Sequence, residues 1–313
     1  MTATQLAKQP PISELPPVLR DRLIRWTKIT DPMELIAAVF DELDERAAIQ
    51  ASLQINTAVA IDMAARHARQ AHSTFRAYTI DTGMLFEETL KYMADLNTFY
   101  GDVLSEGRIE VFRPSRQAVA NLFSSESAGT PIYMRSQEGK KACCGVRKVE
   151  TNLRALDTLD AYIVGLRKDE SLERTTTTKR VSIHTYEVGS DPRQRAVLKV
   201  APFVDTTLAQ IIQYVIANDL PIHPLYGKGY PSFGCGPDCS VALKNADLLG
   251  DAALALNDPS LTNRQKGLYL LSRIAQLPLE QAHQVRDLTR WPWENPNCSK
   301  ECGLHTHKDG SGI

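Results

Sequence analysis

The chain has 313 residues, a formal net charge of −1 and a hydrophobic content of 43%. A chain of this size buries a substantial core, and its balanced charge argues against a nucleic-acid partner. No stretch approaches the roughly 18 consecutive apolar residues of a membrane span, and the N-terminus lacks the basic and then apolar pattern of a secretory signal. We therefore expect a cytoplasmic protein with no membrane contact.

Predicted strands and helices alternate through the first half of the chain. Residues 1–45 are expected to hold a leader and helices, with one helix beginning at Asp31–Pro32. Beyond them, strands are predicted at 47–54, 75–80 and 108–114, and helices at 56–70 and 85–101. This alternation predicts an α/β fold with a mostly parallel, twisted sheet flanked by helices.

The second half begins with strand patterns and ends with helical ones. Further predicted elements are a strand at 160–166, a hairpin of 181–188 with 195–203, and a Thr-capped helix at 205–220. Residues 241–290 form a predicted helical link, and residues 291–313, rich in Pro, Gly and polar residues, are expected to be a mobile tail.

Two loops follow predicted strands at the edge where parallel sheets bind ligands, beside helix N-termini. The first loop offers Ser52, Gln54, Asn56 and Thr57, and the second offers Asp81, Thr82 and Gly83. Neither loop matches a Walker A motif or the GxGxxG fingerprint. Taken alone, each loop is weak evidence and is explained more readily by ordinary caps and turns.

Paired cysteines are the strongest signal in the sequence. Four of the six are Cys143 with Cys144 and Cys235 with Cys239. Structural zinc prefers separated pairs, so adjacent cysteines fit it poorly, whereas neighbouring residues reach two different irons of a larger cubane. We predict a [4Fe–4S] cluster on these four residues, with zinc and unligated thiols as the alternatives.

Cations accompany the cysteines and a predicted strand end. Arg147 and Lys148 follow the first cysteine pair, and Arg167 with Lys168 follows the strand at 160–166. A solvated basic face would also produce this pattern. In a chain that is neutral overall, we interpret them together as a local pocket for an anion.

The tail carries Cys302, a thiol that is better suited to attack than to cluster ligation. Lys300 and His305 nearby favour its thiolate, whereas Glu301 opposes it. A spare cysteine is the simpler explanation for most such residues, and it suits Cys298 better than Cys302.

Five segments together resemble one known family. They are "CCGVRKVETNLRAL", "GLRKDES", "IDTGMLF", "KGYPSFGC" and the late "KECGLH". The chain resembles the assimilatory sulfonucleotide reductases, which act on adenylyl sulfate (APS) or phosphoadenylyl sulfate (PAPS), over about 45–240 and again over 286–305. The resemblance implies an adenine nucleotide α-hydrolase-like fold, related to the ATP pyrophosphatases. It implies a sulfonucleotide-binding core with the iron–sulfur site at 46–240 and a catalytic tail at 291–313.

The resemblance also implies the reaction. Cys302 would attack the sulfate sulfur and expel AMP, and a thiol of thioredoxin, or of glutaredoxin with glutathione, would release sulfite from the resulting S-sulfonate. The reductant is expected to be external. With the loop residues and with Arg290 of "RDLTRWPWE", the expected substrate-binding set is Ser52, Gln54, Asp81, Thr82, Gly83, Arg147, Lys148, Arg167 and Arg290.

Among the reductases that the chain resembles, the double cysteine goes with a [4Fe–4S] cofactor and with APS as the substrate, so the resemblance implies both here. PAPS reduction and a cluster-bearing sensor without catalysis are the alternatives. Three features depart from the family: three residues separate Cys235 from Cys239 instead of two, Asn56 and Thr57 replace acidic residues, and 241–285 exceeds the usual link. That long segment is expected to be a helical lid or a contact between subunits of a homo-oligomer.

Overall fold

A six-stranded sheet forms the centre of the computed structural model, which describes residues 11–124, 131–188, 191–236, 238–243 and 249–290. Its strand order is β3-β2-β1-β4-β6-β5. The strands are β1 Ala47–Gln50, β2 Arg76–Ile80, β3 Glu110–Phe112, β4 Ala161–Val164, β5 Val181–Val188 and β6 Asp191–Val200. All neighbours are parallel except β5 and β6. The predicted mostly parallel sheet is confirmed.

The hairpin of β5 and β6 is longer than the sequence pattern predicts. β6 begins at Asp191, inside the predicted loop, and Glu187 pairs with Gln194 near the tip. A register shift between Glu187 and Val188 accommodates the turn. Pairing with a neighbouring strand therefore extends β6 beyond its apolar residues.

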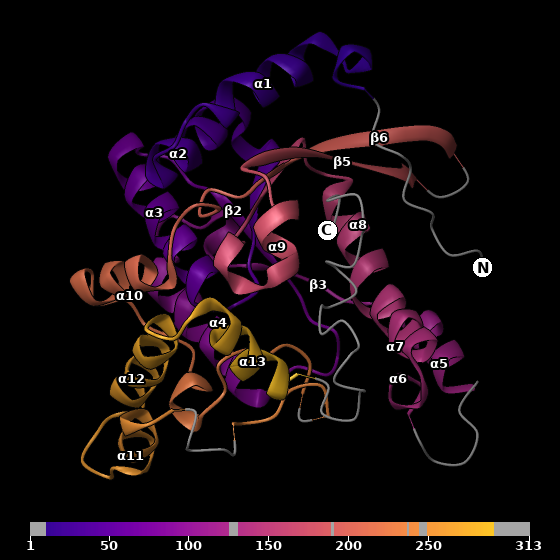
Figure 1. Ribbon diagram of the computed structural model, residues 1–313. Coiled ribbons are helices and arrows are strands. Elements are labelled where there is room, and N and C mark those ends of the chain that lie inside the picture. The colour runs from indigo at the N-terminus through magenta and orange to yellow at the C-terminus, as the bar shows by residue number, and fades with distance from the viewer. Residues whose placement is uncertain (1–10, 125–130, 189–190, 237, 244–248, 291–313) are drawn as a thin grey trace.

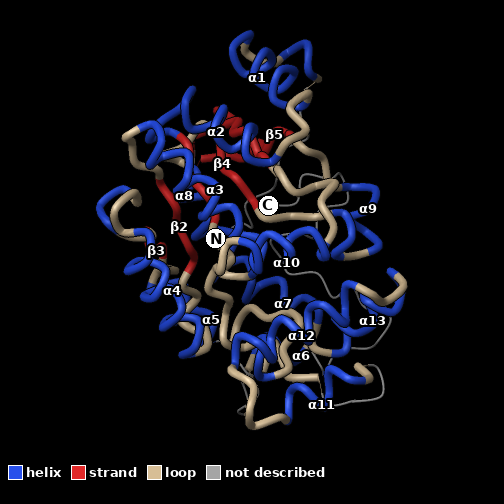
Figure 2. Tube along the Cα trace, turned by 90° about the vertical axis from the view of Figure 1, so that its left-hand side faces the viewer, coloured by secondary structure: helices blue, strands red, loops and turns tan. Residues whose placement is uncertain are grey.

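Helices lie on both sides of the sheet, as Figures 1 and 2 show. In the first half they are α1 Pro17–Thr27, α2 Pro32–Leu43, α3 Ile55–Ala71, α4 Glu87–Tyr100, α5 Arg116–Ser124, α6 Ile132–Arg135, α7 Gln137–Cys144 and α8 Glu150–Leu156. In the second half they are α9 Leu172–Thr177, α10 Leu208–Ala217, α11 Asp251–Asn257, α12 Asn263–Ala275 and α13 Leu279–Leu288.

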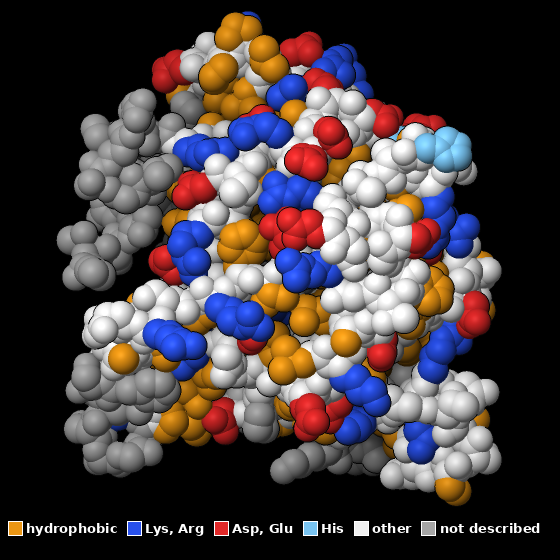
Figure 3. Space-filling view, turned by 180° about the vertical axis from the view of Figure 1, so that it is seen from behind, with side chains coloured by type: hydrophobic (Ala, Val, Ile, Leu, Met, Phe, Trp, Pro, Cys, Tyr) orange, Lys and Arg blue, Asp and Glu red, His pale blue; other side chains and the backbone are white. Residues whose placement is uncertain are grey.

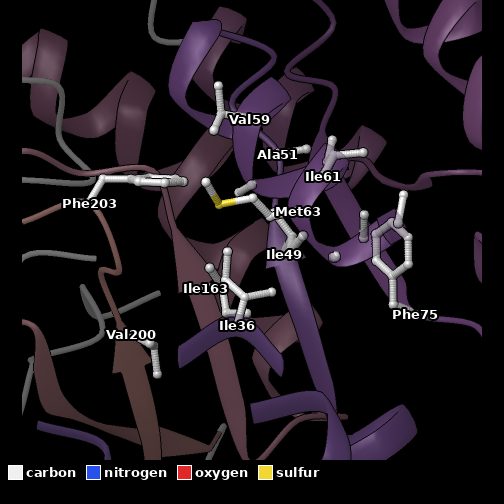
Figure 4. Packing of buried hydrophobic residues seen from close by; sticks show 14 of the residues in the cluster. Ile36, Ile49, Ala51, Val59, Ile61, Met63, Phe75, Ile163, Val200 and Phe203 are labelled. Carbon is white, nitrogen blue, oxygen red and sulfur yellow. The ribbon is translucent and has the colours of Figure 1, made fainter. Parts of the chain in front are cut away.

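The side chains of β1 show how the layers form. Ile49 belongs to the core shared with α2 and α3, where Figure 4 places it beside Ile163 of β4 and Met63 of α3. Ala48, its neighbour in the strand, belongs to the core on the other face, which includes Leu156 of α8. Because successive strand residues point to opposite faces, a short apolar strand supplies both cores.

Local signals fix the helix starts. The Asp31 side chain accepts a hydrogen bond from the Glu34 N–H at 2.9 Å, and Pro32 occupies the first turn of α2, as predicted. Thr207 caps α10 through the Gln210 N–H. α10 ends at Ala217, before the predicted residue 220, because Asp219 adopts a positive φ of 47°.

The surface mixes both signs of charge. Figure 3 shows Lys and Arg side chains interspersed with Asp and Glu across the face it displays. Within the described ranges, no helix is both long and apolar enough to cross a bilayer.

Candidate active site

One cavity of about 400 Å³ lies at the carboxyl ends of three parallel strands. The last residues of β1, β2 and β4, which are Gln50, Ile80 and Val164, all line it. Parallel sheets bind their ligands at this edge, beside helix N-termini. The N-terminus of α3, a helix of 17 residues, borders the same cavity through Gln54, Ile55 and Asn56.

Most of the predicted substrate-binding residues line this cavity. They are Ser52, Gln54, Thr82, Lys148, Arg167 and Arg290. The other three predicted residues, Asp81, Gly83 and Arg147, do not line it. Asp81 forms an ion pair with Arg113 at 3.0 Å and accepts a hydrogen bond from the Gly83 N–H at 2.9 Å. Arg147 lines the adjoining cysteine cavity. The structure brings the two predicted loops to one place.

Hydrogen bonds hold the β1–α3 loop against the loop at 231–235. The Gln54 side chain donates to the Phe233 carbonyl at 3.0 Å, and the Ile55 N–H donates to the Tyr226 hydroxyl at 3.1 Å. Leu53 adopts a positive φ of 60° at the turn into α3. The loop is therefore positioned by distant parts of the chain.

Arg167 is held in a buried polar network. Its Nε donates to Asp169 Oδ1 at 2.7 Å, and its Nη1 donates to Asn56 Oδ1. The Asn56 amide in turn donates to the Gly165 carbonyl at 2.6 Å and to Glu170 Oε1 at 2.9 Å. Asn56, which departs from the family's acidic residue, thus orients a predicted substrate-binding arginine.

The charge of Glu170 completes this network. Burial opposes its ionisation, but Arg174 and Arg167 outweigh burial and lower the pKa of the Glu170 carboxyl. Two guanidinium groups therefore share an ionised carboxylate at the end of β4. The network holds the positive charge of Arg167 and Arg174 next to the cavity, and the carboxylate of Glu170 neutralises part of that charge.

The four cysteines that the sequence singles out lie together. Cys143 and Cys144 end α7, Cys235 and Cys239 lie in the loop after α10, and all four line a small cavity. All four side chains are buried. Met84, Tyr133, Lys140, Arg147 and Lys148 complete its walls.

A π-helical turn at Gly145–Val149 connects α7 to α8 and carries the two cations of the motif. Such turns insert a residue into a helix and often occur at functional sites. Arg147 is only 7% exposed and Lys148 only 9%. Neither is part of a solvated basic face, and Arg147 donates to the Thr82 carbonyl at 2.6 Å.

Burial and charge act in opposite directions on these thiols. Burial raises the pKa of Cys143, although Arg147 and Lys148 act to lower it. Burial, reinforced by Cys235, raises the pKa of Cys239 to about 12. The neutral thiol is thus favoured at Cys143 and Cys239 unless a bound metal centre stabilises the thiolate.

The donor set is chemically compatible with a four-iron cluster, which binds through cysteine thiolates. In the described part of the chain, no group of three or more His, Cys, Asp or Glu side chains is arranged to hold one metal ion. A cubane does not require its ligands to converge on one point, because each cysteine binds a different iron. Four buried cysteines, three neighbouring cations and few other polar groups match that chemistry.

The cysteine cavity adjoins the larger one. Cys235 and Lys148 line both cavities. The Thr82 hydroxyl, which lines the larger cavity, lies 3.4 Å from the Cys235 sulfur. A ligand near Lys148 would therefore lie beside the cysteine site.

Several cavity residues are absent from the sequence-based set. They include Tyr226, Phe233, Glu170, His283 and Arg286. Glu170 lies within the quoted "GLRKDES" segment, three residues after Arg167. That spacing is the signal by which it could be predicted as a charge partner of Arg167. Arg286 begins the quoted "RDLTRWPWE" segment, where it matches the family pattern only approximately, whereas the apolar periodicity around His283 gives no indication of a site.

Cys298 and Cys302 lie outside the described residues. The tail as the carrier of the nucleophile therefore stays a prediction.

The fold and the site define an α/β protein with a large cavity at the strand ends and a group of four buried cysteines beside it. Residues 46–241 match the family model described as phosphoadenosine phosphosulfate reductase domain. The chain belongs to this family, as its motifs predict.

Curated relatives give the same assignment. An adenosine 5'-phosphosulfate reductase of Rhizobium tropici is 31% identical over 74% of this chain and 98% of its own length. A protein of the same name from Neisseria meningitidis serogroup B is 30% identical over 73% of this chain and 71% of its own length. The solved phosphoadenylyl-sulfate reductase of Candida auris has the same fold, with a TM-score of 0.50 and 17% identity over 71% of this chain and 96% of that one.

Proposed function

We propose that this protein reduces adenylyl sulfate to sulfite and AMP with electrons from an external thiol. The observation that carries the proposal is the contact between two cavities. A cavity at the strand ends, large enough for a nucleotide, shares Lys148 and Cys235 with the four-cysteine centre. Membership of the reductase family and the names of the relatives support the same function.

The proposed chemistry proceeds in two displacements. The Cys302 thiolate attacks the sulfate sulfur, a sulfur–sulfur bond forms, and the bond from that sulfur to the bridging phosphate oxygen breaks. AMP leaves with the electron pair, and Cys302 becomes an S-sulfonate. A thiolate of the reductant then attacks the Cys302 sulfur, sulfite leaves with the electron pair, and a second thiol resolves the mixed disulfide.

Cations of the described chain would stabilise the phosphosulfate during the first displacement. Lys148 and Arg290 line the cavity, and both side chains are buried, so their charge is weakly screened. Arg290 donates to the Ser240 hydroxyl at 2.9 Å, which fixes its guanidinium under Gly234. A Cβ at residue 234 would lie 3.0 Å from Arg290 Nη1, so glycine permits this approach.

Cys143, Cys144, Cys235 and Cys239 would hold the proposed [4Fe–4S] cluster. When bound, it supplies an electrostatic field at the cavity rather than the electrons, which the thiols provide. Arg147 and Lys148 offset the negative charge of the four thiolates.

The proposed setting follows the sequence prediction. The reaction would take place in the cytoplasm, with thioredoxin or glutaredoxin and glutathione as the reductant. A homo-oligomer is the proposed assembly.

Sulfite release from APS and from PAPS, with matched thioredoxin, tests the substrate and the reaction. We expect faster release from APS. We expect no release by Cys302→Ser and parent-like release by the matched variant Cys298→Ser. Equal or faster turnover of PAPS would overturn the substrate assignment, and parent-like activity of Cys302→Ser would favour a different reaction.

A further inference from the structure

Helices α12 and α13 lie beyond the residues 46–241 that match the family, yet they form part of the large cavity. Their region supplies a set of apolar side chains to the cavity wall: Leu271, Ile274, Ala275, Leu277, Leu279 and Ala282. The long segment after residue 241 therefore contributes directly to the ligand site, instead of only linking the core to the tail.

α12 is docked closely on the family domain. Gly267 faces the turn at 226–228, where a Cβ on residue 267 would lie 2.9 Å from both Ile222 Cδ1 and Tyr226 Cβ. At the start of the helix, the Asn263 amide donates to the Pro224 carbonyl at 2.8 Å. Tyr226 is itself held in place, because its hydroxyl accepts a hydrogen bond from the Ile55 N–H at the cavity.

α13 is tied to the turn that follows Arg167. His283 Nε2 lies 3.2 Å from the Asp169 carbonyl oxygen, and Arg286 Nη1 donates to the Glu170 carbonyl at 2.9 Å. Figures 1 and 2 both show α13 directly below α9, the helix that follows this turn. The apolar wall is thus held in a fixed place relative to the Arg167 network.

The wall differs in chemistry from the rest of the cavity. Lys148 and Arg290 lie where the cavity meets the cysteine site and suit the anionic part of a nucleotide. The α12–α13 wall offers mainly aliphatic surface through the side chains named above, and His283 and Arg286 are the polar residues of α13 that also line the cavity. A planar base buries apolar area against such a surface, while a few polar groups in other parts of the pocket contact its polar edge.

We propose that α12 and α13 form the surface that contacts the nucleoside of the substrate and set its affinity. The inference rests on the proposed function only for identifying the ligand as an adenosine nucleotide. It assigns the segment a binding role within the same subunit, as distinct from a contact between subunits.

Two substitutions in α13, one in the cavity wall and one outside it, test this role in the full-length protein. Ala282→Phe places a ring in the cavity, and Gln284→Phe places the same ring on an exposed position of the same helix. By calorimetric titration with AMP, we expect at least tenfold weaker binding for Ala282→Phe and parent-like binding for Gln284→Phe. With APS, KM should rise at least tenfold while kcat stays within about twofold, a split that general damage to the fold would not produce.

Leu279→Ala provides a second test that remains valid if Ala282→Phe does not fold. Leu279 lines the cavity but is 39% exposed, so the fold depends little on it. We expect about threefold weaker AMP binding with an unchanged melting temperature.

The outcomes separate this inference from the proposed function. Parent-like AMP affinity in both Leu279→Ala and Ala282→Phe would overturn the inference, as would a parent protein that binds no AMP. A parent that binds AMP but releases no sulfite from APS would overturn the proposed function, while weakened AMP binding in the two variants would still support the nucleoside wall.

Discussion

Asn56 illustrates how a single amide organises the site. It accepts from Arg167 and donates to the Gly165 carbonyl and to Glu170. Gly165 permits this packing, since a Cβ there would lie 2.9 Å from Asn56 Cβ and Thr57 Cγ2. A neutral amide both donates and accepts, whereas a carboxylate would face the ionised Glu170.

Replacing Asn56 by Leu should therefore destabilise the protein by about 2 kcal/mol, because buried polar partners lose their hydrogen bonds. Urea unfolding measures this free energy. The matched substitution Asn257→Leu, at an exposed helix end, should change it by less than about 0.5 kcal/mol. Similar small effects in both variants would show that the network contributes little to stability.

His223 should make stability depend on pH. It is 1% exposed, and burial lowers its pKa from 6.5 to about 3. The Leu225 N–H donates to its Nδ1 at 3.1 Å, and its Nε2 lies 3.0 Å from the Thr89 hydroxyl, an arrangement that suits the neutral ring.

The sign follows from proton uptake. Below pH 6.5 the unfolded chain protonates His223 and the native protein does not, so the stabilisation present above pH 6.5 is lost as the pH falls toward 3. The free energy of unfolding should fall by up to about 1.4 kcal/mol per pH unit from this group. His223→Asn should reduce that slope, and His72→Asn, at an exposed left-handed position where Asn is tolerated, should not. Equal slopes in the two variants would contradict the assignment.

At the scale of elements, Gly267 decides how α12 docks. A side chain there must displace Ile222 and Tyr226, both of which pack against the core. Gly267→Ala should cost about 2 kcal/mol in the free energy of unfolding. Gly145→Ala is the control within another helical turn, because nothing lies within 4 Å of its added Cβ, and it should be neutral or stabilising by about 0.5 kcal/mol. Stabilisation by both substitutions would show that α12 is not tightly docked.

The same elements show what sequence reasoning predicts well. Short apolar runs and capping residues such as Asp31 located the strands and helix starts, because these signals are local, but not all strand ends: β1 stops at Gln50 instead of residue 54, and β6 starts at Asp191 instead of residue 195. The two cysteine pairs line one small cavity, which is the arrangement that the predicted shared site needs.

The remainder depends on contacts between distant segments. The apolar face of α12 or α13 predicts that the helix packs on something, but not that it lines a cavity beside Arg167. Asn56 appeared only as a departure from a family pattern, because its partners Gly165 and Glu170 are more than 100 positions away. The burial of Arg147 and Lys148 depends on a π-helical turn that no residue pattern in the chain indicated.

At the scale of the whole molecule, the cysteine centre joins segments far apart in the chain. Cys143 and Cys144 end α7, whereas Cys235 and Cys239 follow α10. A bound cluster would connect them, and its binding would add to the stability of the folded state.

Protein purified without oxygen should therefore contain iron and sulfide in equal amounts, near four of each per chain. Cys143→Ser should lose most of both and melt at a lower temperature, while Cys298→Ser should keep the parent content. Metal and sulfide analysis measures the outcome. Zinc without iron in the parent would contradict the cluster assignment.

The central claim is that a cysteine of the tail becomes sulfonated by the nucleotide held at the strand ends. Mass spectrometry of the protein after incubation with adenylyl sulfate and no reductant tests it most directly. The account predicts a sulfonate adduct on Cys302, lost on addition of thioredoxin with release of sulfite, and absent from Cys302→Ser. An adduct on one of the four clustered cysteines, or sulfite release with no adduct on any cysteine, would contradict it.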